Sequence, residues 1–134
     1  TQLIHDLLDK GYIPVIAPIG VGRNYESYNI NADSVAGEVA GALAAEKLLL
    51  LTDVEGIYRD FNDKSSFIST LTFEEAQALI VDKVIDGGMI PKVEACVRAL
   101  KGGAKKAHII DGRQQHSLLL EVFTSGGIGS EVVR

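Results

Sequence analysis

The strongest constraint on the fold is a run of four leucines at residues 48–51. The run has the length of a β-strand and carries no polar side chain on either face. Such a strand needs apolar cover on both sides, which is typical of a parallel sheet with helices on either face. We therefore predict an α/β fold in which both faces of this strand are buried.

The pattern around this strand extends the prediction to the rest of the chain. An apolar helical stripe precedes it at residues 34–46, where Gly37 and Gly41 keep the helix thin enough for close packing. Thr72 and Glu75 have the spacing of a capping box. Helices are also expected at residues 3–8, 73–81, 92–101 and 116–123, strands at 12–17, 28–30, 107–110 and 128–133, a hairpin or loop at 20–27, and a break at Gly126-Gly127. This order predicts a three-layer α/β/α sandwich with a largely parallel sheet, forming a single domain over residues 1–134.

Composition and charge exclude several classes of protein. The 134 residues carry a formal net charge of −5, and the isoelectric point is about 5.1, which argues against a nucleic-acid or anionic-membrane surface. Apolar runs are far shorter than the roughly 18 residues of a membrane-spanning helix. The single cysteine, Cys96, allows no internal disulfide, which fits the cytoplasm, or an organellar stroma in a plant or alga. The chain starts at Thr1 within an amphipathic pattern, so we expect it to be part of a longer protein.

Three short polar residues, Asn29, Asn31 and Asp33, alternate along the chain just before the helix expected at residues 34–46. If the run is extended, they share one face, because successive side chains alternate. They would then present two amides and a carboxylate beside a helix start, where backbone N–H groups also point outward. The alternative is that Asn31 or Asp33 only caps the helix and that the others are turn residues.

A second polar site is expected at residues 87–92, where two glycines and Lys92 precede or open a helix. Bare backbone N–H groups and one ammonium group make a good anion environment, although Lys92 taken alone can be a solvated surface lysine. The sequence contains neither a Walker loop nor a dinucleotide-binding glycine fingerprint. The three histidines are scattered, so no metal site is expected, and Cys96 is expected in the core.

Three segments resemble a known family in sequence, order and spacing: residues 29–33 (Asn-Ile-Asn-Ala-Asp), 50–57 (Leu-Leu-Thr-Asp-Val-Glu-Gly-Ile) and 87–93 (Gly-Gly-Met-Ile-Pro-Lys-Val). They resemble the amino acid kinase family, and within it the members that phosphorylate N-acetyl-L-glutamate in the second step of arginine biosynthesis. The resemblance runs from about residue 11 to residue 133. It implies transfer of the γ-phosphoryl group of ATP, with Mg²⁺, to the side-chain carboxylate of N-acetyl-L-glutamate.

The resemblance also implies roles for individual residues. Lys92 would stabilise charge in the transition state, and Asp33 would orient the lysines that contact the phosphates. Asn29 would hydrogen-bond the acetylglutamate substrate, and Asn31 belongs to the same motif. The nucleotide site would be formed by Thr52, Asp53, Val54, Glu55, Gly56, Ile57, Tyr58, Val84, Ile85, Asp86, Gly88 and Met89.

The carboxyl-terminal end resembles the arginine-inhibited members of the family. There His108 and Glu121 would bind free arginine as an effector, and the backbone near Gly127 would bind its carboxylate. The alternative is that Glu121 is an exposed helix residue and His108 a histidine at a strand end.

The resemblance leaves one lobe of the family without a counterpart. A whole family member begins with a lobe that carries a catalytic lysine, paired glycines and a substrate-binding arginine. We therefore expect this chain to be the ATP-binding, carboxyl-terminal half of such an enzyme, which would be a homo-oligomer when whole. Two alternatives are a non-catalytic nucleotide- or arginine-binding module, and a family member that phosphorylates aspartate, glutamate, carbamate or a nucleoside monophosphate.

Overall fold

The computed structural model describes residues 1–124 and 127–134, and its centre is a four-stranded sheet. The strands lie in the order β3-β7-β8-β6, with the bounds β3 (Lys47–Thr52), β7 (Lys106–Asp111), β8 (Ser130–Val133) and β6 (Thr70–Thr72). β3 pairs with β7 and β6 pairs with β8 in parallel, whereas β7 and β8 are antiparallel. The prediction of a largely parallel sheet is confirmed.

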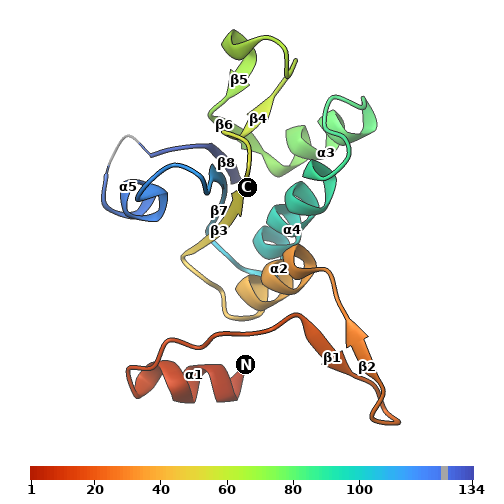
Figure 1. The fold of residues 1–134 in the computed structure, drawn as a ribbon, viewed down its shortest axis with the longest axis vertical. Helices are drawn as coiled ribbons and strands as arrows, with labels where there is room; N and C mark the ends of the chain where they lie inside the picture. The colour runs from red at the N-terminus through yellow and green to blue at the C-terminus, as the bar shows by residue number, and fades with distance from the viewer. Residues whose placement is uncertain (125–126) are drawn as a thin grey trace.

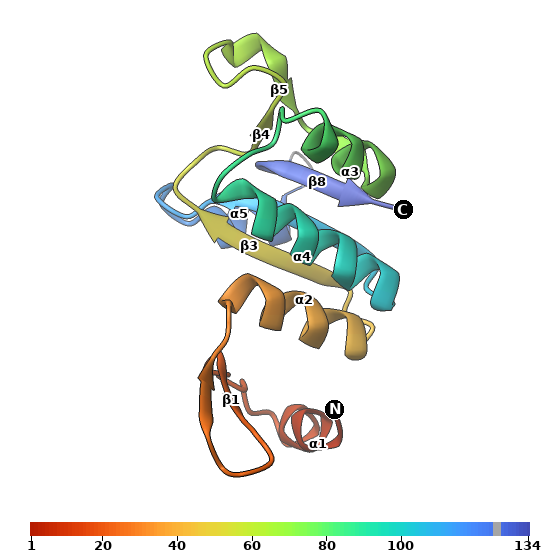
Figure 2. The same ribbon diagram turned by 90° about the vertical axis from the view of Figure 1, so that its right-hand side faces the viewer.

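Helices cover both faces of this sheet (Figures 1 and 2). One face carries α2 (Ala32–Ala42), α3 (Phe73–Val81) and α4 (Met89–Gly102), and the other carries α5 (Ser117–Phe123). The predicted three-layer α/β/α arrangement is therefore confirmed. No described helix combines the length and apolarity needed to cross a membrane.

Smaller elements lie at the two ends of the molecule (Figures 1 and 2). One end holds α1 (Gln2–Asp9) and the hairpin of β1 (Ile19–Val21) and β2 (Ser27–Asn29). Of the two alternatives for residues 20–27, a hairpin or a loop, the structure contains the hairpin. The other end holds the hairpin of β4 (Ile57–Tyr58) and β5 (Phe67–Ile68), with the short 3₁₀ helix η1 (Lys64–Ser66) between them.

The strand expected at residues 12–17 is wrong. These residues have no regular structure, and Ile13 and Val15 are 89% and 95% exposed. A buried strand requires a neighbouring strand to satisfy its backbone N–H and C=O groups, and within the described residues this segment has none.

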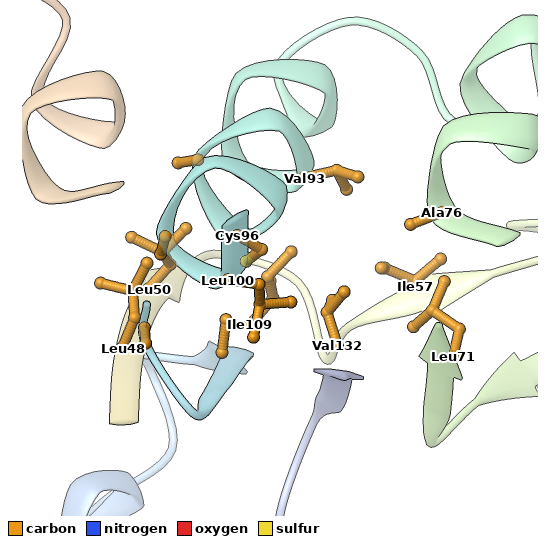
Figure 3. Close-up of a cluster of buried hydrophobic side chains, with 14 of the residues drawn as sticks. Leu48, Leu50, Ile57, Leu71, Ala76, Val93, Cys96, Leu100, Ile109 and Val132 are labelled. Carbon is orange, nitrogen blue, oxygen red and sulfur yellow. The ribbon is translucent and has the colours of Figure 1, made fainter. Parts of the chain in front are cut away.

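The core lies between the sheet and the helices of the α4 face (Figure 3). Cys96 and Leu100 on α4 are completely buried and pack toward the strands, where Ile109 on β7 and Val132 on β8 are also completely buried. Burial raises the pKa of the Cys96 thiol to about 12, so this cysteine is a core residue, as predicted, and stays protonated at neutral pH.

The prediction that both faces of the leucine run are buried is only half right. Leu48 and Leu50 point into the core and are 8% and 5% exposed, but Leu51, on the opposite face, is 45% exposed. β3 is an edge strand of the described sheet, and the face of Leu51 carries only the seven-residue helix α5. The described helices therefore cover that face of β3 only in part.

Small residues let α2 and α4 pack closely, as the sequence predicted. A Cβ atom added to Gly37 would lie 2.7 Å from the carbonyl oxygen of Ala95. One added to Gly102 would lie 2.8 Å from the Cα atom of Gly41. Both distances are well below van der Waals contact, so the backbones of the two helices touch at two levels along their length.

The local signals for the ends of helices and strands are confirmed in part. The Thr72 hydroxyl accepts the backbone N–H of Glu75, and the Glu75 carboxylate accepts the backbone N–H of Thr72, which completes the predicted capping box. Two helices start earlier than expected: α2 spans Ala32–Ala42 instead of 34–46, and α4 begins at Met89 instead of residue 92. The strand β8 begins at Ser130, two residues later than the expected start at residue 128. Gly126, which belongs to the expected break, lies outside the described residues.

Candidate functional site

A cavity of about 590 Å³ opens where β3 ends, between the segment that follows β3 and the segment that leads into α4. The carboxyl ends of strands are where open α/β sheets usually bind ligands. We call it the Lys92 cavity; it is lined by Thr52, Asp53, Val54, Gly56, Ile57, Tyr58, Phe61, Val84, Ile85, Asp86, Gly88, Met89 and Lys92.

The Lys92 cavity brings together all but one of the residues predicted for a nucleotide site. The exception is Glu55, which turns away from the cavity. Its carboxylate accepts hydrogen bonds from Lys64, at 2.6 Å, and from the Tyr58 hydroxyl. The sequence analysis missed Phe61, which lines the cavity from the loop after β4. The one sequence feature that could have pointed to Phe61 is that it is an aromatic residue inside a polar loop.

An ion pair joins the first turns of two helices at one end of the site. The Lys92 ammonium on α4 lies 3.1 Å from each carboxylate oxygen of Asp33 on α2. The contact between Gly37 and Ala95 explains this pairing. Asp33 is four residues before Gly37 and Lys92 is three residues before Ala95, so each lies one helical turn from the contact. The two side chains are 20% and 19% exposed, so the charges are half-buried yet accessible to a ligand.

Asn31 and Asn29 play different structural roles. The Asn31 side-chain oxygen accepts the backbone N–H of Ser34 at 3.1 Å, so Asn31 is the N-cap of α2. Asn29 ends β2, is exposed and pairs with Ile19 across the hairpin. Neither lines the Lys92 cavity, and their predicted roles at the acetylglutamate site stay predictions.

This difference predicts separate effects of two matched substitutions. Asn31→Ala is expected to lower the free energy of unfolding by about 1 kcal/mol, because the Ser34 N–H loses its partner at the helix start. Asn29→Ala is expected to change it by less than about 0.5 kcal/mol, as is usual for a surface position. Urea unfolding followed by circular dichroism measures both. Equal losses in the two variants would contradict the capping role.

A larger cavity of about 1060 Å³ lies beside α5 and contains all three residues predicted for an effector site, His108, Glu121 and Gly127. We call it the Glu121 cavity. Glu121 is only 4% exposed, so it is not the exposed helix residue of the alternative interpretation. The cavity is also lined by charged residues that were not predicted for an effector site: Lys47, Glu55, Lys64, Lys106, Asp111 and Glu131.

Glu121 is the electrostatic centre of this second cavity. Its carboxylate lies 2.8 Å from the Lys47 ammonium and 3.0 Å from Nδ1 of His108, and it accepts the backbone N–H of Ile128 at 2.8 Å. Burial alone would raise the pKa of Glu121. The hydrogen bonds from Lys47 and Ile128, with the positive charge nearby, outweigh burial and hold that pKa below its usual value.

His108 has one nitrogen without a partner. Its side chain is 8% exposed, and its Nε2 atom is buried with no hydrogen-bond partner among the described residues. The nearest acidic oxygen, on Glu131, is 3.6 Å away, and that carboxylate is held by Lys106 at 2.7 Å. Burial is the main cause that lowers the pKa of His108, and the Glu121 carboxylate opposes it. A neutral imidazole that donates from Nδ1 presents a free acceptor at Nε2, which suits an N–H group of a ligand.

The lowered pKa of His108 predicts a pH dependence of stability. Below about pH 6.5 the unfolded chain takes up a proton on this histidine, whereas the folded chain does so only at a lower pH. The contribution of the neutral His108 to the free energy of unfolding is therefore fully present above that pH. It is lost on acidification, by at most about 1.4 kcal/mol per pH unit for one proton. Urea unfolding between pH 7.5 and 5.5 measures this slope, and we expect His108→Gln to flatten it. The same slope in that variant would assign the effect to other groups.

Among residues 1–124 and 127–134, no three His, Cys, Asp or Glu side chains are grouped as metal ligands. The lining of each cavity combines carboxylates with ammonium groups, which suits small charged molecules.

Residues 1–111 match the model of the amino acid kinase family. The chain belongs to that family. It is 64% identical over 132 residues to the acetylglutamate kinase of Heliobacterium modesticaldum, and 58% identical over 133 residues to that of Thermosynechococcus vestitus. These alignments cover 98% and 99% of this chain but 45% of each relative, so the chain spans less than half the length of the curated relatives it matches.

Solved structures give the same fold. The N-acetylglutamate synthase of Neisseria gonorrhoeae, complexed with coenzyme A and N-acetyl-glutamate, matches with a TM-score of 0.89 and 32% identity, covering 100% of this chain and 30% of the synthase. A carbamate kinase of Giardia lamblia bound to AMP-PNP matches with a TM-score of 0.72, covering 99% of this chain and 48% of that protein. Its identity of 21% shows a common fold alone.

Proposed function

We propose that this chain is the ATP-binding, carboxyl-terminal part of an acetylglutamate kinase and forms one domain over residues 1–134. The observation that carries the proposal is the Lys92 cavity, where the segments predicted to bind the nucleotide meet the ion pair of Lys92 and Asp33. The acetylglutamate kinases that are 64% and 58% identical to the chain support it. A cytoplasmic location and a homo-oligomeric assembly of the whole enzyme remain predictions.

The proposed reaction makes an acyl phosphate. A side-chain carboxylate oxygen of N-acetyl-L-glutamate bonds to the γ-phosphorus of ATP, and the bond to the β–γ bridging oxygen breaks, which gives ADP and N-acetylglutamyl phosphate. Catalysis of this kind depends on positioning and on charge neutralisation. Lys92, at the start of α4, would donate to the oxygens of the transferred group, and Asp33 would hold its ammonium in place.

Magnesium would accompany ATP in this site. Mg²⁺ usually keeps several waters and binds through substrate phosphates and one or two carboxylates, so it does not require a cage of protein ligands. The carboxylates of Asp53 and Asp86 line the Lys92 cavity and are oxygen ligands of the preferred kind. They are the residues that would assist the phosphates in holding the ion, which neutralises phosphate charge when bound.

The Glu121 cavity supports a second function, which is binding of arginine as an effector. The supporting observation is a buried carboxylate, on Glu121, beside His108, whose Nε2 atom has no hydrogen-bond partner among the described residues. We propose that an arginine guanidinium replaces the Lys47 ammonium at Glu121 and donates to His108, because a planar guanidinium offers several donors in fixed directions. The freed Lys47 and the backbone near Gly127 would then face the arginine carboxylate. The Neisseria synthase was also crystallised with L-arginine, and it matches this chain with a TM-score of 0.87 at 31% identity.

Calorimetric titration of the 134-residue chain tests both sites. We expect binding of magnesium–AMP-PNP, weak or no binding of N-acetyl-L-glutamate, and binding of L-arginine but not of citrulline, which has a neutral group in place of the guanidinium. Lys92→Ala and Glu121→Gln are the matched variants, and each should affect only its own ligand. Arginine binding without nucleotide binding would overturn the proposed ATP site and favour an arginine-binding module.

The choice of acceptor is tested on the intact enzyme that contains this segment. Coupled measurement of ADP formation with N-acetyl-L-glutamate, aspartate, glutamate, carbamate and a nucleoside monophosphate separates the members of the family. We expect turnover with N-acetyl-L-glutamate. Turnover only with another acceptor would overturn the proposed substrate while leaving the ATP site intact.

A further inference from the structure

Phe61 is a large aromatic side chain that lines the Lys92 cavity and yet is 64% exposed. It lies in the loop between β4 and β5, at the end of the molecule that carries this hairpin (Figure 1). Its ring meets the Tyr58 ring edge to face, with 5.9 Å between centroids and an interplanar angle of 80°. Tyr58 is 7% exposed and also packs edge to face on Phe67. The Phe61 ring therefore has a fixed aromatic neighbour on one side and solvent over much of its remaining surface.

The loop that carries Phe61 is built by its own hydrogen bonds. The Asp60 carboxylate accepts the backbone N–H of Asn62 at 2.9 Å, and the Asp60 carbonyl accepts that of Asp63 at 3.0 Å. The Ser66 hydroxyl accepts the Asp60 N–H at 3.0 Å and lies 2.7 Å from the carbonyl oxygen of Asp63. These hydrogen bonds hold the backbone of the turn that carries Phe61, and in this turn the Phe61 side chain lines the cavity.

The cavity has an apolar part and a charged part. Val54, Ile57, Val84 and Met89 line it together with Phe61, whereas Lys92 supplies an ammonium group that is tied to the start of α4. A ligand that matches this distribution has an anionic group and a flat, apolar group. A nucleotide has both, in its phosphates and its base.

We propose that Phe61 stacks on the base of the bound nucleotide and closes the apolar side of the Lys92 cavity. This inference rests on the proposed nucleotide site and adds the residue that recognises the base. Aromatic rings offer bases a π-face, and stacking contributes substantially to the binding of nucleic-acid bases. The exposed surface of Phe61 is then the surface that the base covers. Because Phe61 contributes little to the core, its removal should affect binding far more than folding.

The test uses three probes that divide a nucleotide into its parts: magnesium–ADP, adenosine and tripolyphosphate. In calorimetric titrations, Phe61→Ala is expected to weaken the binding of magnesium–ADP and adenosine about tenfold, a change that corresponds to about 1.4 kcal/mol. Tripolyphosphate binding is expected to stay within twofold of the unchanged chain, because it has no base. Phe61→Tyr keeps the ring and should retain affinity for all three probes.

Phe123→Ala is the matched control, because Phe123 is a 79% exposed phenylalanine on α5 that does not line this cavity. It should leave all three affinities unchanged. Unchanged binding of magnesium–ADP by Phe61→Ala would overturn the inference, and so would an equal loss of tripolyphosphate binding, which would indicate a general structural effect. If the unchanged chain bound no adenine nucleotide, the proposed function itself would fall, which distinguishes the two failures.

Discussion

Replacement of Lys92 by alanine is expected to lower the turnover of the intact kinase about 10²- to 10³-fold, while its affinity for ATP falls less than about tenfold. A donor aimed at charge that develops in the transition state has an effect of this size when it is removed. Lys92 is suited to that role because both oxygens of Asp33 hold its ammonium at 3.1 Å. Steady-state kinetics with magnesium–ATP and N-acetyl-L-glutamate, combined with equilibrium titration of the nucleotide, separates turnover from binding.

Lys105→Ala is the control for the loss of one positive charge. Lys105 is 65% exposed and pairs with Glu46 on the surface, so its removal should leave turnover unchanged. Asp33→Asn should lower turnover by releasing the Lys92 ammonium, and the double variant should lose little more than Lys92→Ala, because residues in one network are not additive. Equal losses in turnover and ATP affinity for Lys92→Ala would show that this lysine binds the ground state instead.

Gly37→Val is expected to lower the free energy of unfolding by about 3 kcal/mol, the upper part of the range for overpacked interiors. Even the first added carbon would lie 2.7 Å from the carbonyl oxygen of Ala95 and 3.0 Å from its Cα atom. These are backbone atoms, so no rotamer change relieves the contact and α2 must move away from α4. Gly37→Ala should also destabilise, although alanine favours a helix by about 1 kcal/mol relative to glycine. Thermal and urea unfolding measure the losses.

Gly88→Ala is the matched control for Gly37→Ala. Gly88 precedes α4 with φ of −68°, and an added Cβ atom there would meet nothing within 4 Å. Gly88→Ala should change the free energy of unfolding by less than about 0.5 kcal/mol. Displacement of α2 also moves Asp33 relative to Lys92, so Gly37→Ala should lower turnover as well. Full stability in Gly37→Val would mean that the two helices adjust their spacing at no cost.

Features that depend on neighbours along the chain could be predicted from the amino-acid sequence. The apolar run at residues 48–51 identified the strand β3, and periodicity identified the apolar faces of the helices. The spacing of Thr72 and Glu75 identified a capping box that the structure contains. Two glycines in a helical stripe predicted the close approach of α2 and α4. The family resemblance identified the residues that line the Lys92 cavity, except Phe61. These signals are local because hydrogen bonds and side-chain directions repeat within one or two turns.

Features that depend on partners far away in the chain could be seen only in the folded molecule. Residues 12–17 have strand-like composition but no neighbouring strand in the described chain, and Leu51 lies on the less covered face of an edge strand. The directions of Glu55 and Phe61 follow from the fold of the β4–β5 hairpin. Glu121 meets Lys47 across 74 positions of sequence, and Lys92 meets Asp33 across 59. No local pattern encodes such meetings, because they arise only when the packing of strands and helices brings the two segments together.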